Sequence, residues 1–309
     1  MTTDPVDPPE YEPDRRIRRA VGPIFGLACL VATSTGVVVL SVMLGAVFGT
    51  VIRDAGSRPI ASTIGRLLTQ IQSSDPEFAG FRAGVAGSLW LLGMVAVFAI
   101  PVGVGAAVFL EEYTPPGRFR RIIQLNIANL AGVPSIVYGI LGLAVFVRAF
   151  GVRPMALGPT LWSGALTLGL LILPVIVIAT QEALRTVPGS LRQAAMALGA
   201  SRWQVVRDHV LPSAVPGILT GVILALSRAI GETAPLLMVG AAGSILGVPK
   251  GPWSRYTALP VEIYNYAKDP DVKFQAVAAG GILLLLALLL TMNATAIVIR
   301  NRYSRTSRG

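Results

Sequence analysis

Two charged side chains lie inside an otherwise apolar segment and give the strongest indication of chemistry in this chain. Arg228 and Glu232 fall within residues 213–242, where the other side chains are apolar or small. An unpaired charge at the centre of a membrane span costs at least about 2.5 kcal/mol, so such residues are kept where they are paired or face a watery cavity. The four-residue spacing puts both side chains on one helical face, where they can neutralise each other.

This pair has two interpretations. A guanidinium group can hold a tetrahedral oxyanion through two parallel hydrogen bonds. Arg228 would then be a gate or transient station for an anion, with Glu232 displaced as the anion passes. The alternative is a buried ion pair that only fixes helix packing. Gly231 and Pro235 predict an irregular helix at this point, where backbone groups could line a path.

A second irregular segment, AGVPSIVYGILG at 131–142, combines Gly, Pro, Ser and Tyr within one predicted span. Such clustering indicates backbone that lines a pathway, and we therefore include Ser135 and Tyr138 among the pathway residues. By contrast, Gly217 and Gly221 have the four-residue spacing of small residues that allow close helix packing.

The sequence argues against catalysis by this chain. It contains no Walker A loop, no Lys followed by Ser or Thr and no Gly-x-Ser-x-Gly elbow, so we expect neither ATP hydrolysis nor serine-type acyl transfer. The only histidine, His209, and the only cysteine, Cys29, cannot build a metal site of the His-rich or thiolate kind. We expect this chain to bind no cofactor or metal.

A polar segment at 190–212 separates two long apolar segments. It is longer than most helix–helix connections. Ser190 with Gln193, and Ser201 with Gln204, have the spacing of capping boxes, which predicts two short helices with Gly199 in a left-handed turn between them. Each helix would carry one apolar face: Leu191, Ala194, Ala195 and Leu198 on the first, and Trp203, Val206 and Val210 on the second. Counted from Arg185 at the end of the preceding span, this loop covers residues 185–212 and is called the coupling loop. We interpret it as a docking element beside the bilayer.

The composition places the chain in a membrane. Hydrophobic residues make up 53% of it and charged residues 14%, and the mean hydropathy is +0.66. Segments long enough to span a bilayer, about 20 residues, predict an all-α membrane protein with six spans. They lie near 22–52, 83–110, 122–150, 159–181, 213–242 and 275–299. They form one permease domain at 21–300, between a disordered tail at 1–20 and a short tail at 301–309.

Basic residues predict the orientation. Arg residues cluster at 15–19, 118–121, 185–207 and 300–308. These clusters abut span ends, and all of them are cytoplasmic if both termini are cytoplasmic, as the positive-inside rule favours. The net charge of +10 follows from this topology and from contact with anionic lipid, so we predict no binding to nucleic acid.

The coupling loop resembles the EAA loop of ABC importer permeases. That signature has a Glu-Ala-Ala-like start, a Gly four residues after the second Ala, and a later Leu-Pro. Gln193 replaces the Glu of the signature. The matching residues are Ala194, Ala195, Gly199, Leu211 and Pro212.

Further blocks, NLAGVPSIVYGILG at 129–142, LSRAIGETAPLLMVGAAG at 226–243 and ALPVEIYNYAKDP at 258–270, are similar to phosphate ABC importer permeases of the PstA type. This resemblance implies a type I importer permease fold and import of inorganic phosphate across the cell membrane. It implies a second permease (PstC type), two copies of an ATPase that binds ATP and Mg²⁺ (PstB type) and an extracytoplasmic phosphate-binding protein (PstS type). The family uses charged permease residues for phosphate passage, a role carried here to Arg228 and Glu232, with Arg185 as a further pathway residue.

Three alternatives stay open at this stage. The first is an ABC permease for sulfate, molybdate or another small solute. The second is a membrane scaffold or sensor that transports nothing, whose docking loop would bind something other than an ATPase. The third is an ion-coupled secondary transporter, in which the docking loop would have no evident purpose.

Overall fold

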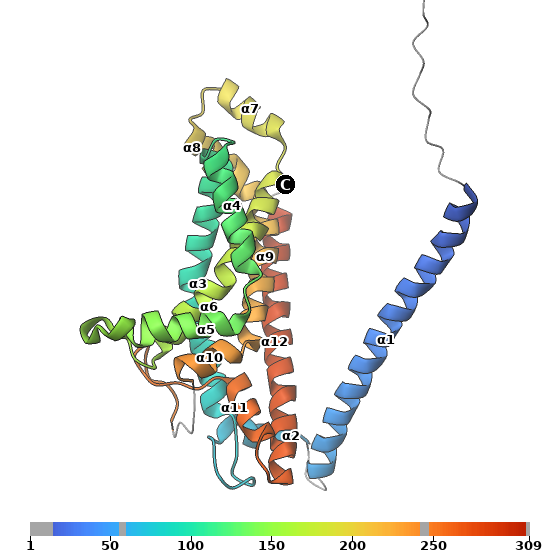
Figure 1. Cartoon of the computed structure of the whole chain (residues 1–309), viewed down its shortest axis with the longest axis vertical. Helices are drawn as coiled ribbons and strands as arrows, with labels where there is room; N and C mark the ends of the chain where they lie inside the picture. The colour runs from blue at the N-terminus through green and yellow to red at the C-terminus, as the bar shows by residue number, and fades with distance from the viewer. Residues whose placement is uncertain (1–14, 56–59, 242–246, 307–309) are drawn as a thin grey trace, which may run out of the picture. The chain divides into compact units, whose positions relative to one another are not determined.

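The computed structural model describes residues 15–55, 60–241 and 247–306, and these form helices and loops without a strand (Figure 1). The chain divides after residue 50 into two units. The first unit consists of most of α1 (Arg15–Ala55), a 41-residue helix whose Pro23–Arg53 portion is apolar enough to cross a membrane. Most of the tail predicted at 1–20 lies outside the described residues. Residues 15–20 already belong to α1.

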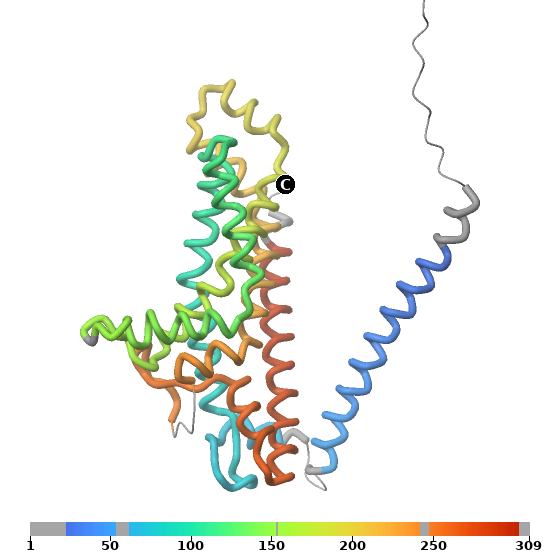
Figure 2. The backbone as a smooth tube through the Cα atoms, viewed as in Figure 1, coloured from blue at the N-terminus to red at the C-terminus, as the bar shows by residue number. Residues whose placement is uncertain are grey.

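The second unit is a helical bundle. Its central helices are α3 (Arg82–Val108), α6 (Leu161–Arg185) and α9 (Leu211–Gly231), and α6 contacts both of the others. The helix α12 (Val272–Thr306) packs against α9 and extends through most of the tail predicted at 301–309. Residues 307–309 lie outside the description. Figure 2 follows this path along the backbone.

Small residues explain how closely the central helices approach one another. Gly217 and Gly221 of α9 lie directly against Ala183 and Ala179 of α6, with no space for a methyl group at either glycine. The predicted packing role of these glycines is therefore confirmed. Without a hydrophobic driving force between helices in lipid, close van der Waals contact of this kind stabilises a membrane bundle.

Two of the predicted spans are interrupted. Residues 122–150 form α4 (Arg118–Ala131) and then α5 (Ser135–Gly142) with its extension to residue 151, and the two parts are bent by 99°. Pro134, directly before α5, cannot donate a backbone hydrogen bond and disfavours helix at the residue before it. The segment 213–242 divides into α9 and the short helix α10 (Ala234–Val239). By length and composition, the described residues contain five spans, or up to six if the bent pair is one span.

Short helices close the two ends of the bundle. At one end lie α7 (Gly189–Ala197) and α8 (Arg202–Val205), and at the other lie α2 (Ile60–Thr69) and α11 (Leu259–Ala267) (Figure 1). The helix α11 lies in the segment between α10 and α12. It contacts α3 and α12, and the ring of its Tyr266 packs against those of Phe81 and Phe274, with centroids 5.3 and 5.4 Å away.

Candidate functional site: a broken span and a docking loop

The charged pair lies where α9 ends. Gly231 is the last residue of the helix, and Glu232 follows it in an extended conformation (φ −75°, ψ 118°). Arg228 Nε lies 3.2 Å from Glu232 Oε1, so the predicted ion pair is present. The four-residue spacing predicts Glu232 on the face of the helix. In the structure, Glu232 lies one residue beyond the end of α9. The Glu232 side chain is 18% exposed and that of Arg228 is 45% exposed. Arg228 is therefore held by one carboxylate while part of its side chain remains open to a partner or a solute.

The helix α10 resumes after the break and packs against α5. Gly139 of α5 lies so close to Pro235 of α10 that a methyl group at Gly139 would overlap the Pro235 backbone. Ser135 begins α5. Tyr138 is buried, donates a hydrogen bond to the Leu130 carbonyl oxygen at 2.8 Å and lies within electrostatic range of Arg228. The two irregular segments singled out from the sequence therefore lie together and form one region.

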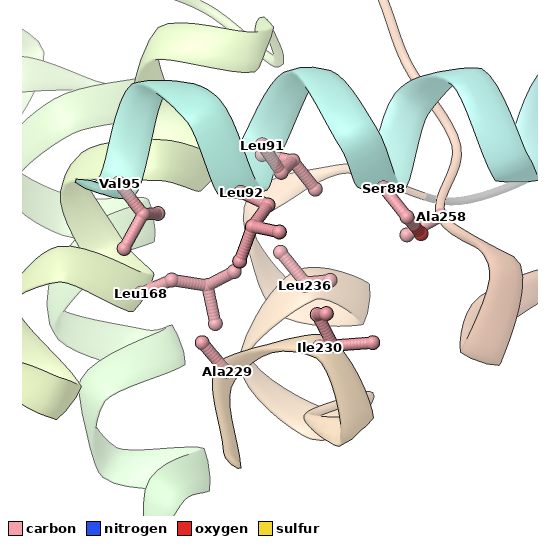
Figure 3. A pocket seen from close by; sticks show the side chains of 9 residues that line it. All are labelled: Ser88, Leu91, Leu92, Val95, Leu168, Ala229, Ile230, Leu236 and Ala258. Carbon is pink, nitrogen blue, oxygen red and sulfur yellow. The ribbon is translucent and has the colours of Figure 1, made fainter. Parts of the chain in front are cut away.

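A small cavity borders this break (Figure 3). Its volume is about 10 Å³, and its lining side chains, among them Leu92, Leu168, Ile230 and Leu236, are almost all apolar. A space of this size holds about one water molecule at most and would need polar partners to do so. Neither Arg228 nor Glu232 lines it. The cavity is therefore a packing feature and not an anion site.

A polar contact that sequence reasoning missed fixes the end of α9 against α12. The Ser227 hydroxyl, next to Arg228 in the sequence, lies 2.6 Å from Asn293 Oδ1. Asn293 stands within a segment apolar enough to span a membrane, where polar side chains commonly hydrogen bond across helices. Its polarity within that segment was the signal available in the sequence.

The coupling loop has the two predicted helices, α7 and α8. Gly199 between them has a φ of +85°, which confirms the left-handed turn. Ser201 and Gln204 form a complete capping box at the start of α8. The prediction for Ser190 is wrong because α7 begins at Gly189, after Pro188, so Ser190 is already inside the helix. From Arg202 onward the chain is helical without a break into α9, through one π-helical turn at Val206–Val210.

The loop presents apolar side chains to its surroundings. Leu198 is 90% exposed and Trp203 is 57% exposed. Gln193, Ala194 and Pro212 are also exposed, whereas Ala195 is buried and Leu211 is half-buried. Large apolar groups exposed on a polar, capped loop favour a protein-binding surface.

Three consecutive residues at the end of α3 hold the loop to the bundle. They lie in a π-helical turn, Phe109–Tyr113, and each contacts an Arg from another element. Glu111 pairs with Arg120 of α4 and, at 3.1 Å, with Arg185 of α6. Glu112 receives two hydrogen bonds from Arg192 of α7, at 2.7 and 3.3 Å. Arg202 of α8 lies over the Tyr113 ring at 5.6 Å.

This cluster changes the interpretation of Arg185. Its guanidinium group is occupied by Glu111 and by Glu182, the latter at 2.8 Å. Arg185 ends α6 close to the level at which Gly217 of α9 lies against Ala183. That level is about three helical turns along α9 from Arg228. The structure therefore does not bring Arg185 together with the charged pair at the break. The sequence shows Glu111 and Glu112 side by side, but it does not show that they pair with Arg185 and Arg192, which are 74 and 80 residues away.

His209 and Asp208 are exposed in the loop, and Asp208 contacts Arg207 at 3.6 Å. Within the described ranges, no three His, Cys, Asp or Glu side chains are grouped so that they could hold a metal ion.

A bundle of apolar helices with a charged pair at a broken span and a helical docking loop has the organisation of a membrane permease. Residues 99–303 match the family model of binding-protein-dependent transport system inner membrane components, and the chain belongs to this family.

Curated relatives are similar over most of their length. The phosphate transport system permease protein PstA 1 of Mycobacterium tuberculosis is 38% identical over 227 residues, which cover 72% of this chain and 72% of the relative. The probable ABC transporter permease protein YqgI of Bacillus subtilis is 36% identical, covering 75% and 81%. The phosphate transport system permease protein PstA of Haemophilus influenzae is 34% identical, covering 74% and 78%.

Solved structures support the fold. A bacterial alginate ABC transporter in complex with a periplasmic protein contains a chain with a TM-score of 0.66 and 15% identity, covering 93% of this chain and 96% of that one. The MetNI methionine ABC transporter, in an inward-facing conformation, gives a TM-score of 0.54 and 22% identity, covering 75% and 99%. The predicted all-α fold of a type I ABC importer permease is confirmed.

Proposed function

We propose that this chain is a permease subunit of an ATP-driven importer of inorganic phosphate. The observation that carries the proposal is the Arg228–Glu232 pair at the break between α9 and α10. A guanidinium group held by one carboxylate can exchange that partner for a phosphate oxyanion, so that the guanidinium charge stays paired throughout the exchange. Relatives that are named phosphate transport permeases support phosphate as the anion.

The pathway would be completed by a second permease. Arg228 is nearly half exposed, and the small cavity beside it is lined almost entirely by apolar side chains. The described residues of this chain therefore enclose no polar path at the pair. A partner permease facing α9, α10 and α5 would close the path around Arg228, with Ser135 and Tyr138 near it. A binding protein would deliver the ion from the far side of the membrane.

The coupling loop would contact the ATPase, with both termini on the cytoplasmic side. Gln193, Ala194, Ala195, Gly199, Trp203, Leu211 and Pro212 would form or support this contact. The Glu111–Glu112–Tyr113 cluster supports the proposal because it links α7 and α8 to α3, α4 and α6 through charged and aromatic contacts. A displacement of the loop by the ATPase would then tilt several spans together. ATP and Mg²⁺ would be bound by the ATPase and not by this chain.

Uptake of labelled phosphate tests the anion and the gate. The complex of this chain with its permease, ATPase and binding-protein partners is expressed in cells that lack their own high-affinity importer. We expect ATP-dependent uptake that resists excess sulfate and falls more than about tenfold in Arg228→Gln and in Glu232→Gln. Arg255→Gln is the matched control, because it removes one exposed positive charge from another loop.

Each contrary outcome has a definite meaning. Strong competition by sulfate or molybdate would replace phosphate by another oxyanion. Uptake that survives both substitutions would reduce the pair to helix packing. Wild-type uptake in a swapped Arg228→Glu/Glu232→Arg chain would do the same, because the swap keeps the ion pair and moves the guanidinium.

The docking contact is tested separately by crosslinking. In a Cys29→Ser chain, Leu198→Cys should crosslink to the ATPase, whereas Trp253→Cys, which is also exposed but lies in the loop before α11, should not. Gly199→Trp should assemble and hydrolyse ATP with much reduced uptake. Crosslinking from both positions or from neither would contradict the assignment of this loop as the ATPase contact.

A further inference from the structure

Glu262 is a buried carboxyl group that transport does not explain. It lies in α11, is 0% exposed, and neither carboxyl oxygen has a hydrogen-bond partner among the described residues. Burial of a polar group without such a partner costs free energy, and burial of an unpaired charge costs far more. The burial of the Glu262 carboxyl group therefore needs a physical explanation.

The surroundings hold the Glu262 side chain firmly. Its carboxyl group lies against Gly84 in the first turn of α3, and a methyl group at Gly84 would overlap it. Its neighbours on α11, Val261 and Ile263, are buried as well. One turn further along α3, the Ser88 hydroxyl accepts a hydrogen bond from the Leu259 N–H at 2.9 Å. Glu262 is thus part of the contact by which α11 is seated on α3.

Among the described residues, no charged side chain offsets a carboxylate at this position. The charged residue of α3 is Arg82 and that of the first turns of α12 is Lys273, and both are exposed. Arg66 of α2 donates to the Glu77 carbonyl oxygen, and Asp75 and Glu77 in the following loop are exposed. Tyr266 interacts electrostatically with Glu262. The pKa of Tyr266 is raised to about 12, mainly by burial.

The ionisation of Glu262 reflects this setting. Burial raises the pKa of its carboxyl to about 8, and the nearby backbone N–H of Gly84 offsets part of the rise. The carboxyl group is therefore neutral in the seated position at neutral pH and becomes charged under mildly alkaline conditions. An ionised Glu262 can regain hydration only if α11 moves away from α3.

We propose that Glu262 is a proton-binding latch: its protonated form keeps α11 seated on the first turns of α3, and its ionised form releases α11. The latch is separate from the Arg228–Glu232 pair and does not depend on which solute is carried. Its effect is to make the α11 end of the bundle open more readily as the pH at that surface rises.

Cysteine accessibility measures the seating of α11 directly. In a Cys29→Ser chain within the assembled complex, Val261→Cys reports a buried position and Tyr264→Cys an exposed one on the same helix. Thiol labelling rates are measured from about pH 6.5 to about pH 9.5, and their ratio removes the pH dependence of the reagent. We expect the buried-to-exposed ratio to rise about tenfold or more with a midpoint near pH 8, and to stay low throughout in Glu262→Gln.

Other results overturn the latch. A ratio that is flat in the Glu262 chain means that ionisation does not release α11. A ratio that rises equally in Glu262→Gln means that another group controls the release. If Glu262→Gln does not assemble, Glu262→Asp takes its place. A shorter side chain must shift the midpoint, and an unmoved midpoint overturns the proposal.

Discussion

Each end of the helical bundle contains a buried carboxyl group, but only one of the two groups has an ion-pair partner. At the α7 end, Glu112 is 8% exposed and is held by two hydrogen bonds from Arg192. At the α11 end, Glu262 is 0% exposed and has no such partner among the described residues. A buried charge must be paired or neutralised. Glu112 is paired with Arg192, whereas Glu262 is neutralised by a bound proton. The α7 end is therefore a charged joint, whereas the α11 end is a nearly uncharged contact that alkaline pH can disturb.

The largest expected effect is the loss of Glu112. Glu112→Ala leaves the half-buried Arg192 without its carboxylate, and removing one partner of a buried ion pair costs about 3 kcal/mol or more. The thermal unfolding midpoint of the purified complex should fall accordingly. Glu182→Gln is the control, because its 65% exposed carboxylate should contribute less than about 1 kcal/mol. Equal falls in the unfolding midpoint would mean that the buried Glu112–Arg192 pair contributes no more to stability than the exposed Glu182 pair.

The second expected effect separates the two ends by pH. Folded Glu262 keeps its proton up to about pH 8, whereas an ordinary glutamic acid loses it near 4.5. The folded state binds more protons between these values, so its stability falls as the pH rises through that window and levels off above it. Glu262→Gln should remove this decline and leave the protein more stable at about pH 9 by a few kcal/mol. The measurement is the unfolding midpoint against pH. An unchanged slope in Glu262→Gln would place the titrating group elsewhere.

A smaller effect should follow from the helix cap in the coupling loop. Ser201→Ala removes the side chain that accepts from the Gln204 N–H at 3.4 Å, and loss of such a cap costs about 1 kcal/mol. Ser201→Asn, which can still cap, should restore most of it. Unfolding midpoints of the two variants test this difference. A loss as large as that of Glu112→Ala would mean that the cap, and not the ion pair, holds the loop.

The smallest effect should come from Arg185→Gln. Its side chain is 44% exposed, and Glu111 keeps Arg120 as a second partner. Exposed ion pairs contribute about 1 kcal/mol or less, and salt weakens them. We expect a small fall in the unfolding midpoint that shrinks at high salt, and phosphate uptake close to wild type. A loss of uptake like that of Arg228→Gln would restore Arg185 to the pathway.

Local sequence patterns predicted several parts of the site. Gly199, Ser201 and Gln204 specify the turn and cap of the coupling loop because these signals act within a few residues. The spacing of Arg228 and Glu232 predicted their ion pair for the same reason. The cap prediction for Ser190 is wrong because α7 begins one residue earlier, at Gly189, directly after Pro188. The bend before α5 and the end of α9 at Gly231 were signalled by Pro134, Gly231 and Pro235, but hydropathy alone counted each segment as one span.

The sequence by itself determined the class of protein, the positions of its apolar segments, the docking loop and the charged pair, because each of these depends on composition or on neighbours in the chain. Only the tertiary structure decided what happens at the two ends of the bundle. Glu112 meets Arg192 eighty residues away, and Glu262 meets Gly84 across a still longer separation. The ionisation of a carboxyl group depends on solvent and on charges within a few ångströms, and folding, not sequence order, sets those distances.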